Sequence, residues 1–393
     1  MLIFKIPVNM KLQLNNTVLM IASLIISVLT GFLFRFAGVG FKVNTLLFAT
    51  GMAYLKLLFL LAVPLVCLSL VTGVMLRLRM RSDGLASARL QAFHCIALVG
   101  AVILGMVAGY IAGPSTIRFI FYKGYATAGF NLFRQVAPAV LLLSALAGAA
   151  AGKIGQEGKE ARRLFRSLAD VFGYAGTLLL RFLPVGLFCL LCPLVSMRGL
   201  SALWPGVKLA LVSAFCCIAY GVLVYGYQLR HCGKDCPRHF LRNFKPVLLQ
   251  AFTACSSGSG EADALRSLQR MGITEDVGLP AWRCGTLLGK AGTVLYWGIA
   301  CLMVTRYAGM PVSLLSGLGI FIWIIFMSLA STKYRGSGLY CALMLLCLLG
   351  TPLQAAAIPL LLFEWLLDGL RSGLNSAAVG TGAYLADKLG WMK

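Results

Sequence analysis

Long apolar runs separated by short polar stretches form most of the sequence. In the first 230 residues, each run supplies the roughly 20 apolar positions that a helix needs to cross the hydrocarbon core of a bilayer. None of the runs alternates between apolar and polar residues, as the strands of a membrane β-barrel would. The pattern therefore predicts an all-α integral membrane protein whose first six spans lie at 17–37, 44–76, 91–112, 133–152, 168–195 and 206–229.

After residue 245, serine and glycine interrupt the apolar segments. Val247–Thr253 is followed by Cys255–Gly260 and then by a returning helix at Glu261–Met271. Ser331–Gly338 interrupts a second apolar segment in the same way. Non-helical backbone at membrane depth is tolerated only where protein or a water-filled cavity surrounds it, and paired interruptions are typical of a transporter's binding site. We interpret the two as re-entrant helical hairpins; the alternative is two short helix pairs at the membrane surface.

A third interruption, Gly285–Gly292, lies between the hairpins and contains a charged residue, Lys290. We interpret it as an unwound turn inside a span. The spans and hairpins together predict a bundle of eight transmembrane helices and two re-entrant hairpins.

The last predicted span, 359–386, carries a stripe of polar residues. Glu364, Asp368, Arg371 and Asn375 follow one another at intervals of three or four, which places them on one helical face with Ser372 beside them. Ionisable groups inside a span are costly and usually mark a substrate path. Arg371 is suited to binding a carboxylate and Asp368 to binding an ammonium group. The alternative is that these two residues pair with each other and need no ligand.

Charge and cysteine content refine this interpretation. Charged residues make up only 12% of the chain, about half the share in soluble domains, yet the net charge is +23. The basic residues gather in every second loop, which is the positive-inside pattern, places the N-terminus in the cytoplasm, and favours anionic lipid over nucleic acid as the partner. These clusters are Arg77, Arg79, Arg81 and Arg89; Lys153, Lys159, Arg162, Arg163 and Arg166; and Arg230, Lys234, Arg238, Arg242 and Lys245.

Most of the 13 cysteines lie in apolar runs, where free cysteine acts as a small hydrophobic residue. For His231, Cys232, Cys236 and His239, a zinc site is the alternative to a solvated basic loop. No pairing of nucleophile and base predicts an enzyme, and we expect no cofactor.

Several segments resemble the dicarboxylate/amino acid:cation (sodium) symporter family, which includes glutamate and aspartate transporters. Phe59–Gly73 resembles its second span, Phe182–Phe188 its fifth, and Ala251–Ile273 its first hairpin. Leu366–Asn375 resembles its eighth span. The resemblance implies an inverted-repeat, glutamate-transporter-like fold and a homotrimer in the inner (plasma) membrane.

The resemblance also implies a division of the chain. Residues 1–90 and 114–203 would form a scaffold from spans 1, 2, 4 and 5. Residues 91–113, span 3, would join the transport core at 204–393. It implies that Arg371 binds a substrate carboxylate and Asp368 an amino group. The other substrate-binding positions that it implies are Ser256, Ser257, Thr293, Ser372 and Asn375, with Arg335 and Gly336 in the tip that serves as a gate.

The sequence departs from this family where sodium would bind. The resemblance places the family's sodium-ligand positions at Gly289, Ala291 and Val379, which have no carboxylate or amide side chain here. Hard cations prefer several oxygen ligands, so we expect sodium coupling to be weakened. One hypothesis is that the Lys290 ammonium replaces a sodium ion; the alternative is that Lys290 points away from the site.

A proton is the other ion that could drive transport. Glu261 and Glu364 are the candidates for proton coupling, unless each is half of a structural ion pair. The sequence thus predicts a secondary transporter of a small carboxylate solute, a dicarboxylate or an amino acid, that works by an alternating-access, elevator-type symport mechanism. The alternatives are a sodium-independent exchanger or proton-coupled carrier, and a membrane sensor that does not transport.

Overall fold

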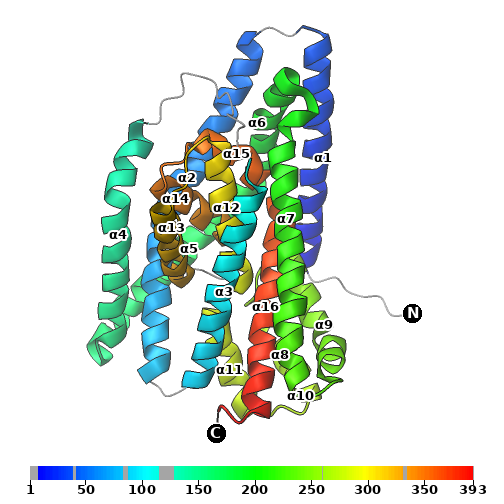
Figure 1. Ribbon diagram of the computed structural model, residues 1–393. Coiled ribbons are helices and arrows are strands. Elements are labelled where there is room, and N and C mark those ends of the chain that lie inside the picture. The colour runs from blue at the N-terminus through cyan, green and yellow to red at the C-terminus, as the bar shows by residue number, and fades with distance from the viewer. Residues whose placement is uncertain are drawn as a thin grey trace.

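The computed structural model describes residues 8–38, 41–82, 87–114, 128–258, 260–330 and 334–392, and within these ranges the chain is helical and contains no strand. The long helices run alongside one another through the length of the molecule (Figure 1). Those of the first half are α1 (Val8–Phe36), α2 (Phe41–Ser82), α3 (Ala88–Ala112), α4 (Ala128–Lys153), α5 (Lys159–Leu179), α6 (Leu183–Arg198) and α7 (Trp204–Tyr220).

Shorter helices dominate the second half. A π-helical turn, Gly221–Tyr225, joins α7 to α8 (Gly226–His231), and a 3-10 turn, η5 (Ser328–Ala330), follows α13. The remaining helices are α9 (Cys236–Ala254), α10 (Glu261–Arg270), α11 (Glu275–Leu288), α12 (Ala291–Tyr307), α13 (Leu314–Met327), α14 (Ser337–Leu348), α15 (Leu353–Leu361) and α16 (Glu364–Lys388).

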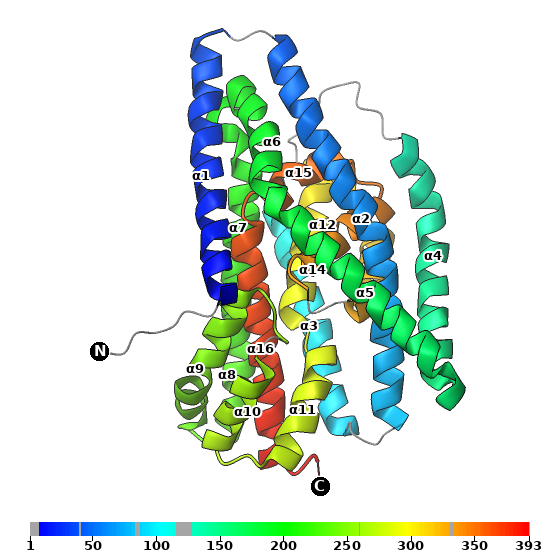
Figure 2. The ribbon, with the colours of Figure 1, turned by 180° about the vertical axis from the view of Figure 1, so that it is seen from behind.

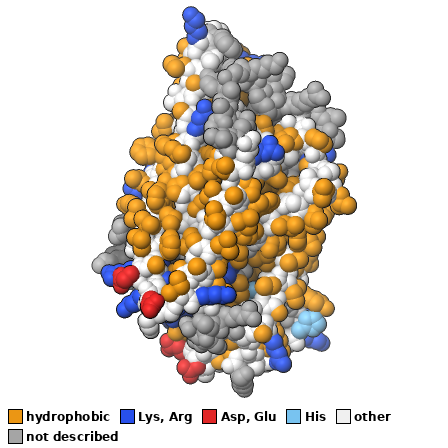
Figure 3. Space-filling view, turned by 90° about the vertical axis from the view of Figure 1, so that its left-hand side faces the viewer, with side chains coloured by type: hydrophobic (Ala, Val, Ile, Leu, Met, Phe, Trp, Pro, Cys, Tyr) orange, Lys and Arg blue, Asp and Glu red, His pale blue; other side chains and the backbone are white. Residues whose placement is uncertain are grey.

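Membrane-spanning character is clear from the length and composition of the helices. Among the described residues, 7 helices are long and apolar enough to cross a bilayer, or up to 8 if α15 and α16 form one span. Apolar side chains cover the middle of one face of the molecule, whereas charged side chains gather towards its two ends (Figure 3). The prediction of an all-α, multi-pass membrane protein is therefore confirmed.

Two predicted spans differ from the helices observed. The fifth was expected at 168–195, but α5 and α6 are joined by a 3-10 turn into one helical stretch, Gln156–Ala202. Pro184 stands at the start of α6, and because proline lacks an N–H, the chain tightens just before it. The last span was expected to begin at 359, but a bend of 71° separates α15 from α16, which begins at Glu364. The bend puts Glu364 in the first turn of α16, two turns before Arg371.

The breaks in the second half agree with the sequence pattern. α9 packs against α10, the next helix along the chain, and α13 packs against α14. The short helices of this half lie among the long ones in both views of the ribbon (Figures 1 and 2). Ser259 and residues 331–333 lie outside the described residues. The third break is shorter than predicted, because only Gly289 and Lys290 separate α11 from α12.

α3 and α12 lie side by side. Gly105 and Gly109 of α3 face the backbone of α12, and a Cβ atom on Gly109 would lie 2.6 Å from the carbonyl oxygen of Ile299. Small residues four apart let two membrane helices approach closely. α12 is thereby held in the centre of the bundle, with almost every side chain buried.

We expect Gly105→Leu to separate α3 from α12, because a side chain at this position meets the Leu295 backbone. Overpacking of this kind costs about 1–3 kcal/mol. The matched control is Gly226→Leu, since nothing lies within 4 Å of a Cβ at Gly226. Thermal unfolding of the purified protein should show a lower midpoint for the first variant only. Equal midpoints for both variants would contradict the role assigned to the close approach.

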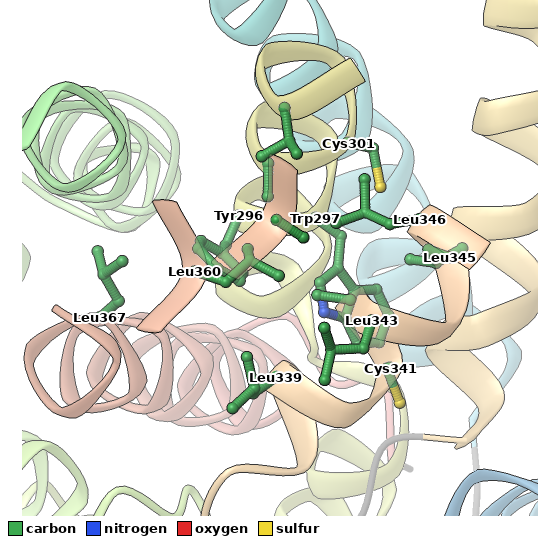
Figure 4. Close-up of a cluster of buried hydrophobic side chains, with 14 of the residues drawn as sticks. Tyr296, Trp297, Cys301, Leu339, Cys341, Leu343, Leu345, Leu346, Leu360 and Leu367 are labelled. Carbon is green, nitrogen blue, oxygen red and sulfur yellow. The ribbon is translucent and has the colours of Figure 1, made fainter. Parts of the chain in front are cut away.

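A cluster of apolar side chains joins α12 to α14 and α15 (Figure 4). Trp297 of α12 donates a hydrogen bond from its indole N–H to the carbonyl oxygen of Gly338, at 2.8 Å. Leu339, Leu343 and Leu360 pack in the same fully buried cluster. This packing holds the start of α14 against α12.

Arg77 of α2 reaches across to two other elements. Its guanidinium donates hydrogen bonds to the carbonyl oxygens of Leu287, at 2.5 Å, and Ser328, at 3.3 Å. These carbonyls belong to the end of α11 and to η5. α2 is thus tied to the two breaks that flank the polar residues of the bundle.

Candidate functional site

The polar residues of α16 form a buried ion-pair cluster. One guanidinium nitrogen of Arg371, Nη2, donates to Oε1 of Glu364 at 2.6 Å and to Oδ1 of Asp368 at 2.8 Å. All three side chains are buried. A buried charge needs both a counter-charge and hydrogen bonds, and here the two carboxylates supply them from the helix that carries the arginine.

The surroundings of Arg371 hold its guanidinium in place. Its carbon Cζ lies 4.3 Å from the centre of the Tyr296 ring, so a cation–π contact covers one face. A Cβ atom on Gly338 would lie 2.8 Å from the same carbon, so a larger residue there would displace the guanidinium. The other terminal nitrogen, Nη1, is buried and has no hydrogen-bond partner among the described residues. Arg371 therefore keeps one donor nitrogen free.

Asp368 connects α16 to the tip between α13 and α14. Its Oδ2 accepts a hydrogen bond from the backbone N–H of Gly336, at 2.9 Å. Gly336 has a φ of 75°, a left-handed conformation that favours glycine. The neighbouring Arg335 is half-buried. One of the two predicted gate residues, Gly336, is thus in contact with the aspartate.

Asn375 caps α12 from the side. Its Oδ1 accepts from the backbone N–H groups of Gly292, at 2.8 Å, and Thr293, at 3.3 Å. Its Nδ2 donates to Oγ1 of Thr293 at 2.8 Å. The first N–H groups of a helix have no partner within the helix, and α12 obtains its partner from another helix. The break between α11 and α12 is therefore stabilised by the polar face of α16.

A small polar cavity lies between these elements, with a free volume of about 20 Å³. That is room for about one water molecule. Six predicted substrate-binding residues line it, together with Lys290; they are Ser256, Ser257, Thr293, Asp368, Ser372 and Asn375. The cavity thus lies where the three interruptions between helices meet the polar face of α16. Arg371 lies behind Gly338, which is itself part of the lining.

The two carboxylates proposed for proton coupling occupy different settings. Glu364 belongs to the buried cluster with Arg371. Glu261, at the start of α10, pairs with Arg283 of α11 at 3.1 Å, and both side chains are exposed. Glu261 does not line the cavity. Both are halves of ion pairs, which was the alternative considered for each.

Val379 and His94 pack against the positions that the resemblance assigned to sodium. A Cβ on Gly289 would lie 2.9 Å from the carbonyl oxygen of Gly285, 3.1 Å from the Val379 side chain and 3.3 Å from the His94 ring, and one on Gly285 would lie 2.7 Å from Val379. Ala291 is buried in the first turn of α12. His94 of α3 is 1% exposed, and its two ring nitrogens have no partner in the part of the chain that the structure describes.

His94, Tyr296 and Gly338 are residues near the site that sequence reasoning missed. A single histidine within the apolar segment 91–112 was the only available signal for His94. Tyr296 and Gly338 carry no such signal, because their contacts with Arg371 depend on how α12 and α14 pack. The zinc alternative gains no support, since no group of three or more His, Cys, Asp or Glu among the described residues is placed to hold a metal ion.

Comparison with known sequences gives consistent matches. A profile of the sodium:dicarboxylate symporter family matches residues 130–389, more than half of the chain. A proton/glutamate-aspartate symporter of Escherichia coli is 25% identical over 212 residues, which cover 54% of this chain and 48% of that protein. A proton/sodium-glutamate symport protein of Geobacillus stearothermophilus is 20% identical over 88% of both chains. A C4-dicarboxylate transport protein of Cupriavidus pinatubonensis is 21% identical over 73% of both.

Proposed function

Because the chain belongs to the sodium:dicarboxylate symporter family, we propose that it carries a small carboxylate solute, an acidic amino acid or a dicarboxylate, across the membrane by alternating access. The observation that carries this proposal is the buried polar cavity between the tips of two helix pairs and α16. Ionisable residues at such a place inside an apolar bundle are expected on a substrate path.

Arg371 and Asp368 would exchange partners when substrate binds. In the structure described here, Asp368 bonds to both Arg371 and the Gly336 N–H, and the cavity has room for about one water molecule. An amino acid therefore needs the tip at Gly336 to move away. A substrate carboxylate would then take the place of Asp368 on Arg371, and Asp368 would accept the ammonium group.

The closed tip supports a gating role for Arg335 and Gly336. Ser256, Ser257, Thr293, Ser372 and Asn375 would complete the pocket once it opens. We propose that the helix pairs α9–α10 and α13–α14 are re-entrant, and that α3 and α7–α16 form a core that moves in an elevator manner against α1, α2 and α4–α6. We propose a homotrimer in the inner (plasma) membrane with a cytoplasmic N-terminus, following the alternation of basic loops.

Uptake by the purified full-length protein in proteoliposomes tests this function. We expect accumulation of at least one of radiolabelled L-aspartate, L-glutamate, succinate and fumarate above that in empty vesicles. The unlabelled compound on the outside should compete with it. Binding of one of these compounds without any uptake would instead favour the sensor. Neither binding nor uptake across the panel would reject a carboxylate substrate.

A further inference from the structure

An apolar groove lies apart from the polar cavity, and the two share no lining residue. Three parts of the chain line the groove: the stretch from α7 through the π-helical turn to α8, then α9, and α16. α8, α9 and α16 lie next to one another near one end of the molecule in both views of the ribbon (Figures 1 and 2). The free volume of the groove is about 530 Å³. Pockets that hold small organic molecules measure roughly 300–1,000 Å³, so the groove is large enough for a ligand.

Small residues keep this space open. Gly226 of α8 and Gly373 of α16 both line the groove. A Cβ atom on Gly226 would have nothing within 4 Å, and one on Gly373 would lie 4.0 Å from the carbonyl oxygen of Leu248. The π-helical turn Gly221–Tyr225 directly precedes Gly226, and single turns of this kind are frequent at functional sites. The sequence thus leaves room between these helices, whereas α3 and α12 use their glycines to pack closely.

The rim of the groove carries exposed apolar side chains. Trp204–His231, which forms one wall, is one of the candidate membrane spans. In this wall Ile218 and Val222 are 60% and 65% exposed, and Leu249 of α9 is 53% exposed. Leu374 of α16, which also lines the groove, is buried. A groove with an apolar rim on a membrane span opens to the acyl chains of the bilayer.

One basic side chain interrupts the apolar lining. Lys245, near the middle of α9, lines the groove and is exposed. Arg242 and Arg238, also exposed, precede it by three and seven positions, which places the three residues on one face of α9. None of the three forms an ion pair in the part of the chain that the structure describes, and α9 contains no acidic residue. The groove therefore combines an apolar interior with an unpaired basic stripe along α9.

From this combination we propose that the groove binds an anionic phospholipid of the bilayer, with one acyl chain along the apolar lining and the phosphate at Lys245 and Arg242. A lysine in an apolar setting extends its side chain so that the ammonium reaches the polar boundary, where lipid headgroups lie. Each basic residue near an anionic headgroup strengthens the attraction about fivefold, and each buried methylene of the chain adds to it. This site is separate from the proposed substrate site and does not depend on which solute is carried.

A lipid in the groove would bridge α9 and α16. Phe252 near the end of α9 and Leu370 of α16 both line the groove. The two helices are already in close contact there, since a Cβ atom on Gly369 would lie 2.7 Å from the carbonyl oxygen of Phe252. A ligand that binds the folded protein and not the unfolded chain raises the stability of the fold. The bound phospholipid should therefore stabilise the packing of α9 on α16.

Thermal unfolding of the purified full-length protein in detergent, with added dioleoyl phosphatidylglycerol or dioleoyl phosphatidylcholine, tests the charge of the ligand. We expect phosphatidylglycerol to raise the midpoint of wild type at concentrations about tenfold or more below those that phosphatidylcholine requires. Lys245→Met combined with Arg242→Gln should weaken the effect of phosphatidylglycerol about tenfold or more and leave that of phosphatidylcholine unchanged. Lys153→Met combined with Arg166→Gln, at exposed basic residues outside the groove, should behave as wild type.

Filling the groove tests the acyl chain separately. Gly373→Phe places a ring in the open space and should weaken the effect of both lipids. Gly319→Phe, the same substitution in α13 where nothing lies within 4 Å of a Cβ, should not. Equal potency of the two lipids on wild type, or wild-type potency of phosphatidylglycerol on the double variant at Lys245 and Arg242, would overturn the proposal. A stronger effect of sodium oleate than of phosphatidylglycerol would overturn it in favour of a free fatty acid. None of these results depends on uptake, so the proposed carrier stands or falls separately.

Discussion

We expect Arg371→Ala to abolish uptake of acidic solutes and to lower the free energy of unfolding by about 3–5 kcal/mol, the usual cost of breaking a buried ion pair by removing one partner. The variant leaves Glu364 and Asp368 buried and adjacent without their shared cation. It also removes the guanidinium from the Tyr296 ring. Uptake in proteoliposomes and thermal or chemical unfolding of the same preparation measure the two effects.

A double variant distinguishes a binding role from a structural one. Arg371→Met combined with Glu364→Leu removes one positive and one negative charge and replaces them with apolar side chains. Such replacements of buried ion pairs are often neutral or stabilising. The double variant should therefore regain part of the stability lost in Arg371→Ala, since only Asp368 is then left without its cation, and it should still take up no aspartate. If either variant binds aspartate or succinate as wild type does, Arg371 is not the carboxylate ligand.

Asn375→Leu should be the most damaging change outside the ion-pair cluster. It leaves the N–H groups of Gly292 and Thr293 and the Thr293 hydroxyl without their partner in the apolar centre of the bundle. A buried polar group left unsatisfied costs about 1–3 kcal/mol, so the loss should be about 3 kcal/mol or more. The start of α12 would shift, and uptake should fall below detection together with the unfolding midpoint.

The adjacent residue supplies the control. Ser376 is fully buried on the same helix, and its hydroxyl has no partner among the described residues. Ser376→Ala should therefore leave the midpoint unchanged or raise it slightly, and uptake should persist. A fall in midpoint of equal size in the two variants would show that α16 tolerates no change here, and that capping of α12 is not the cause.

The sequence predicted the long helices well because crossing a bilayer requires one apolar run for each span. The face of α16 was predictable for a related reason, since Glu364, Asp368, Arg371 and Asn375 recur at helical spacing. The bend before Glu364 was not predictable, because Pro359 lies inside α15 and the chain turns only after Leu361. The range 359–386 therefore joined two helices that point in different directions.

The partners within the site depend on contacts that spacing does not encode. Periodicity placed Asp368 one turn from Arg371, and it left open whether they pair. The structure adds Glu364 as a second acceptor on the same nitrogen and places the Gly336 N–H on Asp368. His94 lies about 200 positions before the break between α11 and α12, against which its ring packs. The local sequence pattern around His94 does not predict this contact.

The reach of Arg77 from α2 to the carbonyls of Leu287 and Ser328 bears on turnover rate. If the core slides past α2, both hydrogen bonds must break in every cycle and be replaced by others in the opposite state. Their energy then belongs to the activation barrier for translocation and lengthens the dwell time of this conformation, on the microsecond-to-millisecond scale of collective domain motion. Arg77 would thus slow translocation of the core without changing the affinity of the pocket for substrate.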